Sequence, residues 1–156
     1  MIKVGDKLPN ATFTVMAADG PKPMNTDEIF AGRRIVLFAV PGPFTPTCDR
    51  NHLPSFRDKT AEIKAKGVDA IACTAINNVF VLSAWAKASE AADKIEFLAD
   101  GNGDFAEAAG LSVTVGRIPR SKRYSMLVDN GVVKSINIEE NPGIEKSGAD
   151  NILTQL

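Results

Sequence analysis

Two continuous apolar runs with a helical segment between them constrain the fold of this chain more than any other feature. The runs are RRIVLFAV at 33–40 and VDAIACTAI at 68–76. Apolar runs without polar alternation are typical of strands that are buried on both faces. Residues 46–66 predict a helix, with Gly67 as its end. The three segments predict a β-α-β unit with a right-handed crossover, and therefore a partly parallel sheet between layers of helices.

The rest of the chain predicts further strands and helices of the same sheet. ATFTV at 11–15 alternates, which indicates a strand that ends at the Asp19-Gly20 turn. Thr26 precedes two acids and is expected to cap a short helix. Residues 124–138 predict an antiparallel hairpin with Asn130-Gly131 in its turn. The remaining expected elements are a helix over 78–92, a strand over 95–100, a short helix over 104–111 and a last helix that starts near Ser147 or Asp150.

This order of elements predicts one α/β domain over residues 1–156 with a thioredoxin-like fold. The central sheet is expected to be mixed, because the hairpin adds antiparallel strands, and to carry helices on both faces. The sequence contains no internal repeat, no low-complexity tract and no linker that divides it.

Charge and hydropathy narrow the classes of partner. The chain has 18 basic and 19 acidic residues, a net charge of −1, and its only basic cluster is RIPRSKR at 117–123. That cluster is too short to predict nucleic-acid binding. The first residues lack the apolar core of a signal peptide, and no apolar run is long enough to span a membrane. We therefore expect a cytoplasmic protein without membrane contact, or one that reaches another compartment after it loses a presequence that this sequence does not contain.

The stretch VPGPFTPTCDRNHLP at 40–54 predicts the chemistry. Thr45 suits the N-cap of a helix and Pro46 its first position, which puts Cys48 in the first turn. Free N–H groups and the helix dipole favour an anion there, so we expect a reactive thiolate. The loop Pro41-Gly42-Pro43 is stiff and is expected to shield the sulfur. Pro54 is expected to kink the helix.

Cys48 has other possible roles besides that of a reactive thiolate. A buried structural cysteine is the ordinary role of such a residue. A zinc site lacks ligands, because the chain has two cysteines and one histidine. A thioredoxin-type dithiol is excluded, since Asp49-Arg50-Asn51 follows and no CxxC exists. A non-catalytic thioredoxin-like interaction or redox-sensing module stays open as the alternative to an enzyme.

The segment PGPFTPTCDRNHLPSF resembles the active-site signature of the peroxiredoxins, PxxxTxxC, with Pro41, Thr45 and Cys48 in its fixed positions. It is similar to the type II, or Prx5, group, in which PGxFTPTC is followed by HLP. The resemblance continues through INNVFVLSAW, FLADGNGDF and RYSMLVDNGVV to NILTQL, and so covers nearly the whole chain. Two positions depart from the pattern. Pro43 replaces a small residue, and Asp49 replaces a serine, so its charge is expected to weaken thiolate stabilisation somewhat.

The resemblance implies an antioxidant, thiol-dependent peroxidase that reduces hydrogen peroxide and alkyl hydroperoxides through a sulfenic acid at Cys48. Donors to the leaving oxygen would be Thr45 and the N–H groups of the first turn. The family's arginine corresponds to Arg123, whereas the residues alone leave Arg117 and Arg120 as alternatives. His52, one turn after Cys48, is expected to support the site through a hydrogen bond, although a purely structural role is also open.

The resemblance also bears on recycling and assembly. Cys73 lies in an apolar strand and is expected to be a core residue, a weak candidate for a resolving thiol, and the C-terminal region GIEKSGAD contains no cysteine. An external thiol, either glutathione with glutaredoxin or thioredoxin, would then reduce the enzyme. Neither a cofactor nor a metal is expected. Related chains form homodimers near the active-site helix and the following helix. Phe44, Phe80 and Trp85 are aromatic candidates for that surface, and a core position is equally open for each of them.

Overall fold

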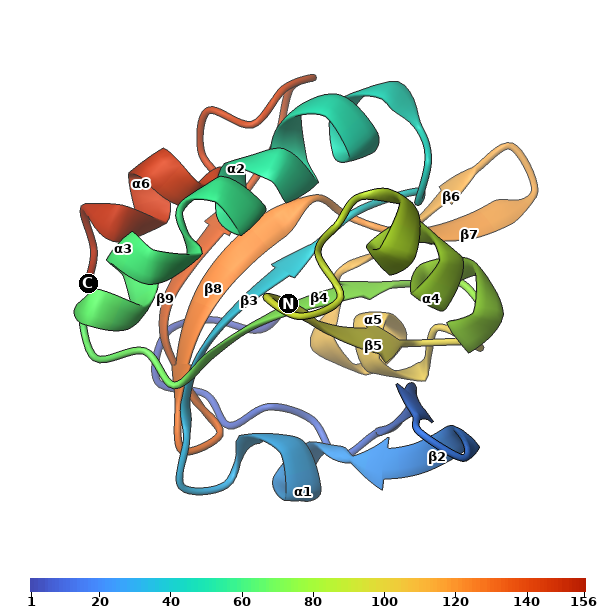
Figure 1. Cartoon of the computed structure of the whole chain (residues 1–156), viewed down its shortest axis with the longest axis horizontal. Coiled ribbons are helices and arrows are strands. Elements are labelled where there is room, and N and C mark those ends of the chain that lie inside the picture. The colour runs from blue at the N-terminus through green and yellow to red at the C-terminus, as the bar shows by residue number, and fades with distance from the viewer.

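A seven-stranded mixed sheet forms the centre of the protein, in a computed structural model that describes residues 1–156. The strand order is β2-β1-β5-β4-β3-β8-β9 (Figure 1). The strands of this sheet are β1 (Thr12–Ala17), β2 (Gly20–Asn25), β3 (Arg34–Ala39), β4 (Ala70–Ala75), β5 (Glu96–Ala99), β8 (Tyr124–Asp129) and β9 (Val132–Ile138). The helices are α1 (Thr26–Phe30), η1 (Cys48–His52), α2 (Leu53–Asp58), α3 (Thr60–Ala65), α4 (Val79–Ala88), α5 (Asp104–Ala109) and α6 (Ala149–Leu153). The predicted thioredoxin-like α/β fold is confirmed.

The two apolar runs form the central strands, as predicted. β3 and β4 pair in parallel, and β8 pairs with β3 in the antiparallel direction. Alternate residues of β3 enter two separate cores: Phe38 belongs to the core under α2, α3, α4 and α6, and Leu37 to the core over α1 and α5. Figure 1 shows these two sets of helices on opposite sides of the sheet. Continuous apolar sequence is therefore required, because each face of β3 is buried.

The hairpin of β8 and β9 also forms as predicted. Asn130 and Gly131 both have positive φ, 48° and 78°, which is the backbone that a tight two-residue hairpin turn needs.

Two other hairpins, formed by β1 with β2 and by β6 (Ser112–Val115) with β7 (Ile118–Ser121), were not predicted. Strand β2 contains Pro21 and Pro23, which are tolerated because β2 is an edge strand. Strands β6 and β7 form a separate two-stranded sheet that projects from the body (Figure 1).

The cap expected at Thr26 is wrong by one residue. Asn25 is the N-cap of α1: its side chain accepts from the N–H of Glu28, and the Glu28 carboxylate accepts from the N–H of Asn25. Thr26 is buried instead, where its hydroxyl donates to the carbonyl of Pro9 and accepts from the N–H of Ala11. The last helix, α6, begins after Gly148, close to both predicted starts.

The helix predicted over 46–66 is divided into segments. A π-helical turn, η1, ends two residues before Pro54, and the N–H of Leu53 donates to the carbonyl of Cys48. The kink expected at Pro54 stays a prediction. Pro54 has no N–H for an α-helical bond, so a shift of register there costs little. A second break occurs at Lys59, and Gly67 ends the segment with φ +88°.

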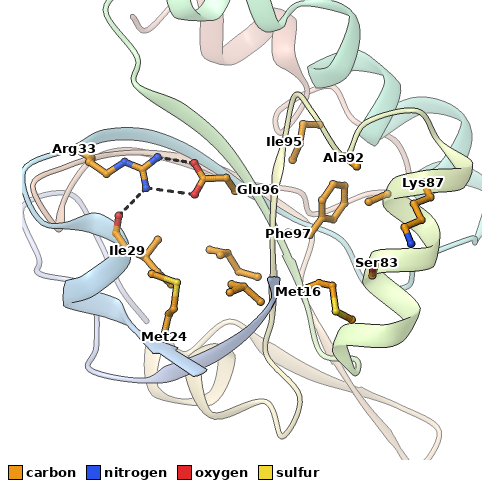
Figure 2. A pocket seen from close by; sticks show the side chains of 13 residues that line it. Met16, Met24, Ile29, Arg33, Ser83, Lys87, Ala92, Ile95, Glu96 and Phe97 are labelled. Carbon is orange, nitrogen blue, oxygen red and sulfur yellow. Dashed lines mark hydrogen bonds and ion pairs between the residues drawn. The ribbon is translucent and has the colours of Figure 1, made fainter. Parts of the chain in front are cut away.

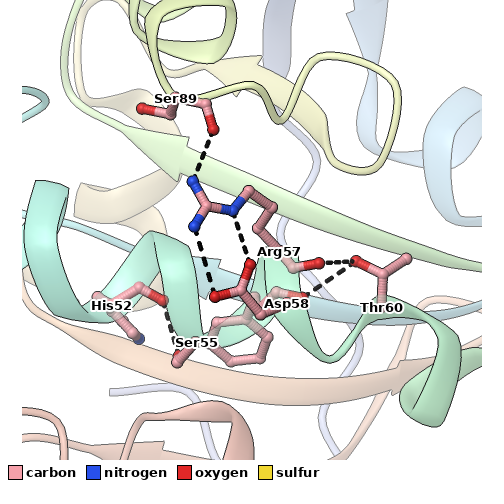
Figure 3. A network of polar contacts seen from close by, with 7 residues as sticks. His52, Ser55, Arg57, Asp58, Thr60 and Ser89 are labelled. Carbon is pink, nitrogen blue, oxygen red and sulfur yellow. Dashed lines mark hydrogen bonds and ion pairs between the residues drawn. The ribbon is translucent and has the colours of Figure 1, made fainter.

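Side-chain hydrogen bonds cover the break at Lys59. The Thr60 hydroxyl donates to the carbonyls of Phe56 and Arg57, and Arg57 donates to the carbonyl of Ser89 and to Asp58, as Figure 3 shows. The carbonyls of Phe56 and Arg57, at the end of α2, thus accept from the side chain of Thr60, the first residue of α3. These bonds hold α3 close to α2.

A cavity lies where the sheet opens between β1 and β5. These strands pair only at Thr14 and Ala99, and a cavity of about 320 Å³ lies beyond that pair. Nine of its 13 lining residues are hydrophobic. Arg33 lies on one side of the cavity, where it donates to Glu96 and to the carbonyl of Ile29 (Figure 2). None of the predicted site residues lines this cavity.

No helix of the protein has the length and hydropathy needed to cross a membrane.

Candidate active site

Cys48 lies in the first turn of the helix that follows β3. Helical backbone begins at Pro46, which makes Cys48 the third helical residue, as predicted. The predicted N-cap role of Thr45 is wrong, because no side chain caps this helix start and the Thr45 hydroxyl donates away from it. Its side chain is buried, with 1% exposed. The backbone N–H groups of Thr47 and Cys48 donate to no group of the chain. Two free donors and the positive end of the helix therefore lie beside the sulfur, an arrangement that favours a negative charge there.

Arg123 reaches the sulfur from the neighbouring strand. Ala39, the last residue of β3, pairs with Tyr124, the first residue of β8, so Arg123 lies beside the loop that leaves β3. Its Nη2 lies 3.0 Å from the Sγ of Cys48. Of the two alternative arginines, Arg120 donates to the carbonyl of Pro41 and Arg117 has no side-chain bond. Only Arg123 bonds to the sulfur.

His52 holds the other end of the Arg123 guanidinium. Nη1 of Arg123 lies 2.9 Å from Nδ1 of His52, and Nε2 of His52 lies 2.9 Å from the carbonyl oxygen of Ser147. An arginine only donates and a carbonyl only accepts, so Nδ1 is the acceptor and Nε2 carries the proton. His52 is fully buried against Phe38 and Phe56. Burial lowers the pKa of His52 to about 3, so the ring is neutral.

The loop before the helix holds Thr45 and Pro41. The Thr45 hydroxyl donates to the carbonyl of Gly42, and no bond joins it to Cys48. The expected aim of this hydroxyl at the reacting atoms is thus not seen in this conformation. Pro41 is half-buried and Pro43 is buried, so the proline loop covers the helix start. Phe44 has φ +64°, an uncommon value for a large side chain, and the chain reverses there before the helix.

Asp49 does not turn toward the thiol. Its carboxylate accepts a 2.8 Å hydrogen bond from the indole N–H of Trp85, on α4. The expectation that Asp49 weakens the thiolate is not supported by this geometry, because the charge is directed to another helix. Trp85 is fully buried, so of its two expected places the core is confirmed and the dimer surface is wrong. Phe44 and Phe80 are 53% and 64% exposed and remain candidates for such a surface.

Cys73 is a core residue, as expected. It is fully buried in the same core as Cys48 and Phe38, and both cysteines are free thiols. Burial raises the pKa of the Cys73 thiol well above its ordinary value, and the nearby Cys48 raises it further. A thiol with a raised pKa is a poor nucleophile and a poor resolving group.

A groove of about 760 Å³ opens beside the site. Pro41, Thr47 and Arg123 line the end nearest Cys48. Val113 and Val115 of the projecting hairpin line it further out, so the groove has both polar and apolar walls.

Two further residues at the site, Ser147 and Glu139, were not predicted as site residues. Ser147 was expected only near a helix start, and Glu139 was not singled out. Ser147 contributes the carbonyl that fixes His52, and Glu139 in turn accepts hydrogen bonds from the N–H and the hydroxyl of Ser147. Both lie far from Cys48 in sequence, and no local pattern marks them.

Nearly the whole chain matches known proteins. Residues 3–153 match the family model Redoxin. The chain is 45% identical over 163 residues to Peroxiredoxin-2E-2, chloroplastic, of Oryza sativa subsp. japonica, which covers 99% of this chain and 72% of that protein. It is 41% identical to Hybrid peroxiredoxin hyPrx5 of Haemophilus influenzae, over 97% of this chain and 65% of that protein. The crystal structure of reduced Prx3 in complex with H2O2 from Vibrio vulnificus superposes with a TM-score of 0.95 at 44% identity, with 99% of each chain covered.

Proposed function

The chain belongs to the peroxiredoxins, in the type II or Prx5-like group of the Redoxin family, and we propose on that basis a mechanism, a reductant and a substrate class for it. Its family makes it a thiol-dependent peroxidase, an oxidoreductase of antioxidant function. The non-catalytic alternative is therefore not retained. The contact of Arg123 Nη2 with Cys48 Sγ, 3.0 Å, at a helix start with free N–H groups, carries the proposal.

In the proposed reaction the Cys48 thiolate attacks one oxygen of a hydroperoxide. A sulfur–oxygen bond forms and the oxygen–oxygen bond breaks, so that sulfur is oxidised to a sulfenic acid and the peroxide is reduced. The leaving oxygen takes a proton and departs as water or as an alcohol. Arg123 and the N–H groups of Thr47 and Cys48 would stabilise the negative charge that shifts from sulfur to the leaving oxygen. The donor role of Thr45 stays a prediction, because its hydroxyl donates to Gly42 here.

We propose that an external thiol reduces the sulfenic acid. The only other thiol, Cys73, is buried inside a central strand, and a disulfide with Cys48 would require that strand or the helix start to unfold. Glutathione with glutaredoxin, or thioredoxin, is the reductant proposed. The proposed enzyme thus uses Cys48 alone and has no resolving cysteine of its own.

The groove beside the site supports hydrogen peroxide and alkyl hydroperoxides as substrates. It ends at Arg123, and its apolar wall of Val113 and Val115 offers contact to an alkyl group.

We also propose that the protein forms a homodimer in which the exposed Phe44 and Phe80 take part. We further propose a cytoplasmic location. Recovery of a tagged chain in an organelle fraction would contradict that location.

The proposed role of Cys48 is tested with Cys48→Ser. Because a hydroxyl does not form a nucleophile at neutral pH as a thiol does, peroxide consumption with glutathione and glutaredoxin, or with thioredoxin, should fall to background. Circular dichroism should remain that of the folded chain, since the substitution is nearly isosteric. Substantial remaining turnover in the folded variant would reject Cys48 as the attacking group.

A further inference from the structure

A closed ring of hydrogen bonds begins and ends at Arg123, and it extends well beyond the reacting atoms. Glu139 directly follows β9, where Ile138 pairs with Tyr124. Its backbone N–H donates to the carbonyl of Arg123, at 2.9 Å. Its side chain turns away from that contact toward the segment before α6. Glu139 is thus fixed to Arg123 through its backbone while its carboxylate is free to bind elsewhere.

The Glu139 carboxylate holds Ser147. Its Oε2 accepts from the N–H of Ser147 at 2.9 Å, from the Ser147 hydroxyl at 2.7 Å and from the N–H of Lys146 at 3.1 Å. Ser147 is fully buried. Hydrogen bonds to a charged acceptor are stronger than those between neutral groups, and three of them converge on one oxygen. Residues 140–147 form no regular helix or strand, so this carboxylate is a principal anchor of that segment.

Ser147 then fixes His52. Its carbonyl accepts the Nε2 proton of His52, and Nδ1 of His52 accepts from Arg123. Arg123 has a long side chain with many rotamers, and it contacts the sulfur with only one nitrogen. The bond to His52 selects the rotamer in which Nη2 lies against Cys48. Each link of the ring thus limits the freedom of the next.

We propose that Glu139 is a positioning residue for the peroxidase reaction, and that it acts on Arg123 through Ser147 and His52. It touches neither the sulfur nor the peroxide. Its effect is to hold the His52 ring in place, which aligns the guanidinium with the thiolate and with the leaving oxygen. This inference rests on the proposed role of Arg123, which the variants below test separately.

The first test compares Glu139→Gln with Glu145→Gln. The second variant removes the same charge from the same segment, but Glu145 is exposed and makes no hydrogen bond or ion pair. An amide at 139 is a weaker acceptor and presents an NH₂ group to the donors of Ser147. We expect the second-order rate constant with hydrogen peroxide to fall about tenfold in Glu139→Gln, a loss of the size of one charged hydrogen bond, and to be unchanged in Glu145→Gln.

A second readout separates positioning from stability. The ultraviolet absorbance of the Cys48 thiolate is followed against pH in both variants and in the parent, along with their melting temperatures. Displacement of Arg123 should move the midpoint of the absorbance to higher pH in Glu139→Gln. A slower reaction with an unmoved midpoint and a lowered melting temperature would mean that Glu139 only stabilises the fold, and the proposal would fail. If the parent chain showed no peroxidase turnover, the proposed function would be rejected. The comparison of absorbance midpoints between Glu139→Gln and the parent would still test whether Glu139 positions Arg123.

A double-mutant cycle tests the route through His52. His52→Leu breaks the ring, whereas His52→Gln offers one amide donor and one acceptor and should retain most of the rate. In the His52→Leu background, Glu139→Gln should have almost no further effect, because its influence passes through the ring. Fully additive losses from Glu139→Gln and His52→Leu would show that the two residues act independently, which would overturn the proposed route.

Discussion

Removal of the Arg123 charge is expected to slow the peroxide step by about 10²-fold or more. The variant is Arg123→Gln, which keeps a hydrogen-bond donor of reduced reach and deletes the charge. For unit charges on Cys48 and Arg123 at the observed 3.0 Å, Coulomb's law gives about 5.5 kcal/mol at an effective dielectric constant of about 20. That figure is an upper limit, because water and neighbouring dipoles replace part of the lost interaction.

The net loss follows from comparable interactions. A hydrogen bond to a charged group contributes about 1.5–3 kcal/mol net, which corresponds to a factor of about 10 to 150 in rate. The same guanidinium also stabilises the charge that develops on the leaving oxygen, and loss of one such donor costs about 10²- to 10³-fold. The second effect persists at high pH, where the thiol is ionised without help from Arg123. We therefore expect the defect to shrink but not to vanish as the pH is raised.

The single tryptophan of the chain provides the assay. Trp85 donates its indole N–H to Asp49, the residue after Cys48, so oxidation of the sulfur should change its fluorescence. Stopped-flow mixing of the reduced protein with hydrogen peroxide then gives the rate constant directly. The control is Arg117→Gln, an arginine without a side-chain bond. A rate for Arg123→Gln within threefold of the parent, in a folded protein, would refute the role of Arg123.

Three further predictions concern recycling, pH and assembly. Cys73→Ala should keep near-normal turnover with glutathione and glutaredoxin, and a quantitative Cys48–Cys73 disulfide in mass spectra after one equivalent of peroxide would contradict this. His52 is neutral when folded but protonates when unfolded below about pH 6.5, so the free energy of unfolding should fall by ~1 kcal/mol between about pH 7 and about pH 5.5. Urea titrations should show a smaller fall in His52→Gln, and an equal fall would exclude His52 as its source. Light scattering should give a dimer mass, and a monomer at micromolar concentration would reject the homodimer.

The central part of the fold could be predicted because its determinants are local. Continuous apolar runs mark β3 and β4, which are buried on both faces. Asn130-Gly131 marks the hairpin turn, since both residues adopt positive φ there. Thr45-Pro46 likewise marks the helix start at Cys48. In each case neighbouring residues determine the backbone, so the sequence pattern is sufficient.

The rest could not be predicted, because it depends on contacts between distant segments. Strand β2 has two prolines, and only its place at the sheet edge makes them tolerable. The π-helical turn depends on how the helix start is held against its neighbours. His52 and Ser147 are 95 positions apart, and Arg123 and His52 are 71 apart. No periodicity or motif encodes such pairs, so the ring around Arg123 appears only once the sheet has brought β8, β9 and the C-terminal segment together.

The acid after the reactive cysteine is compatible with a thiolate because the two side chains are held by different elements. Successive residues on a helix point about 100° apart. Cys48 points to Arg123 at the start of β8, whereas Asp49 points to Trp85 on α4. The first turn of the helix is thus held by two side-chain hydrogen bonds, one from the Arg123 guanidinium to Cys48 and one from the Trp85 indole to Asp49. Backbone bonds hold the same turn: the N–H of Asp49 donates to the carbonyl of Thr45, and the N–H of Leu53 donates to the carbonyl of Cys48. Asp49 therefore helps to fix the place of the sulfur, and its charge is engaged by the indole N–H of a buried side chain.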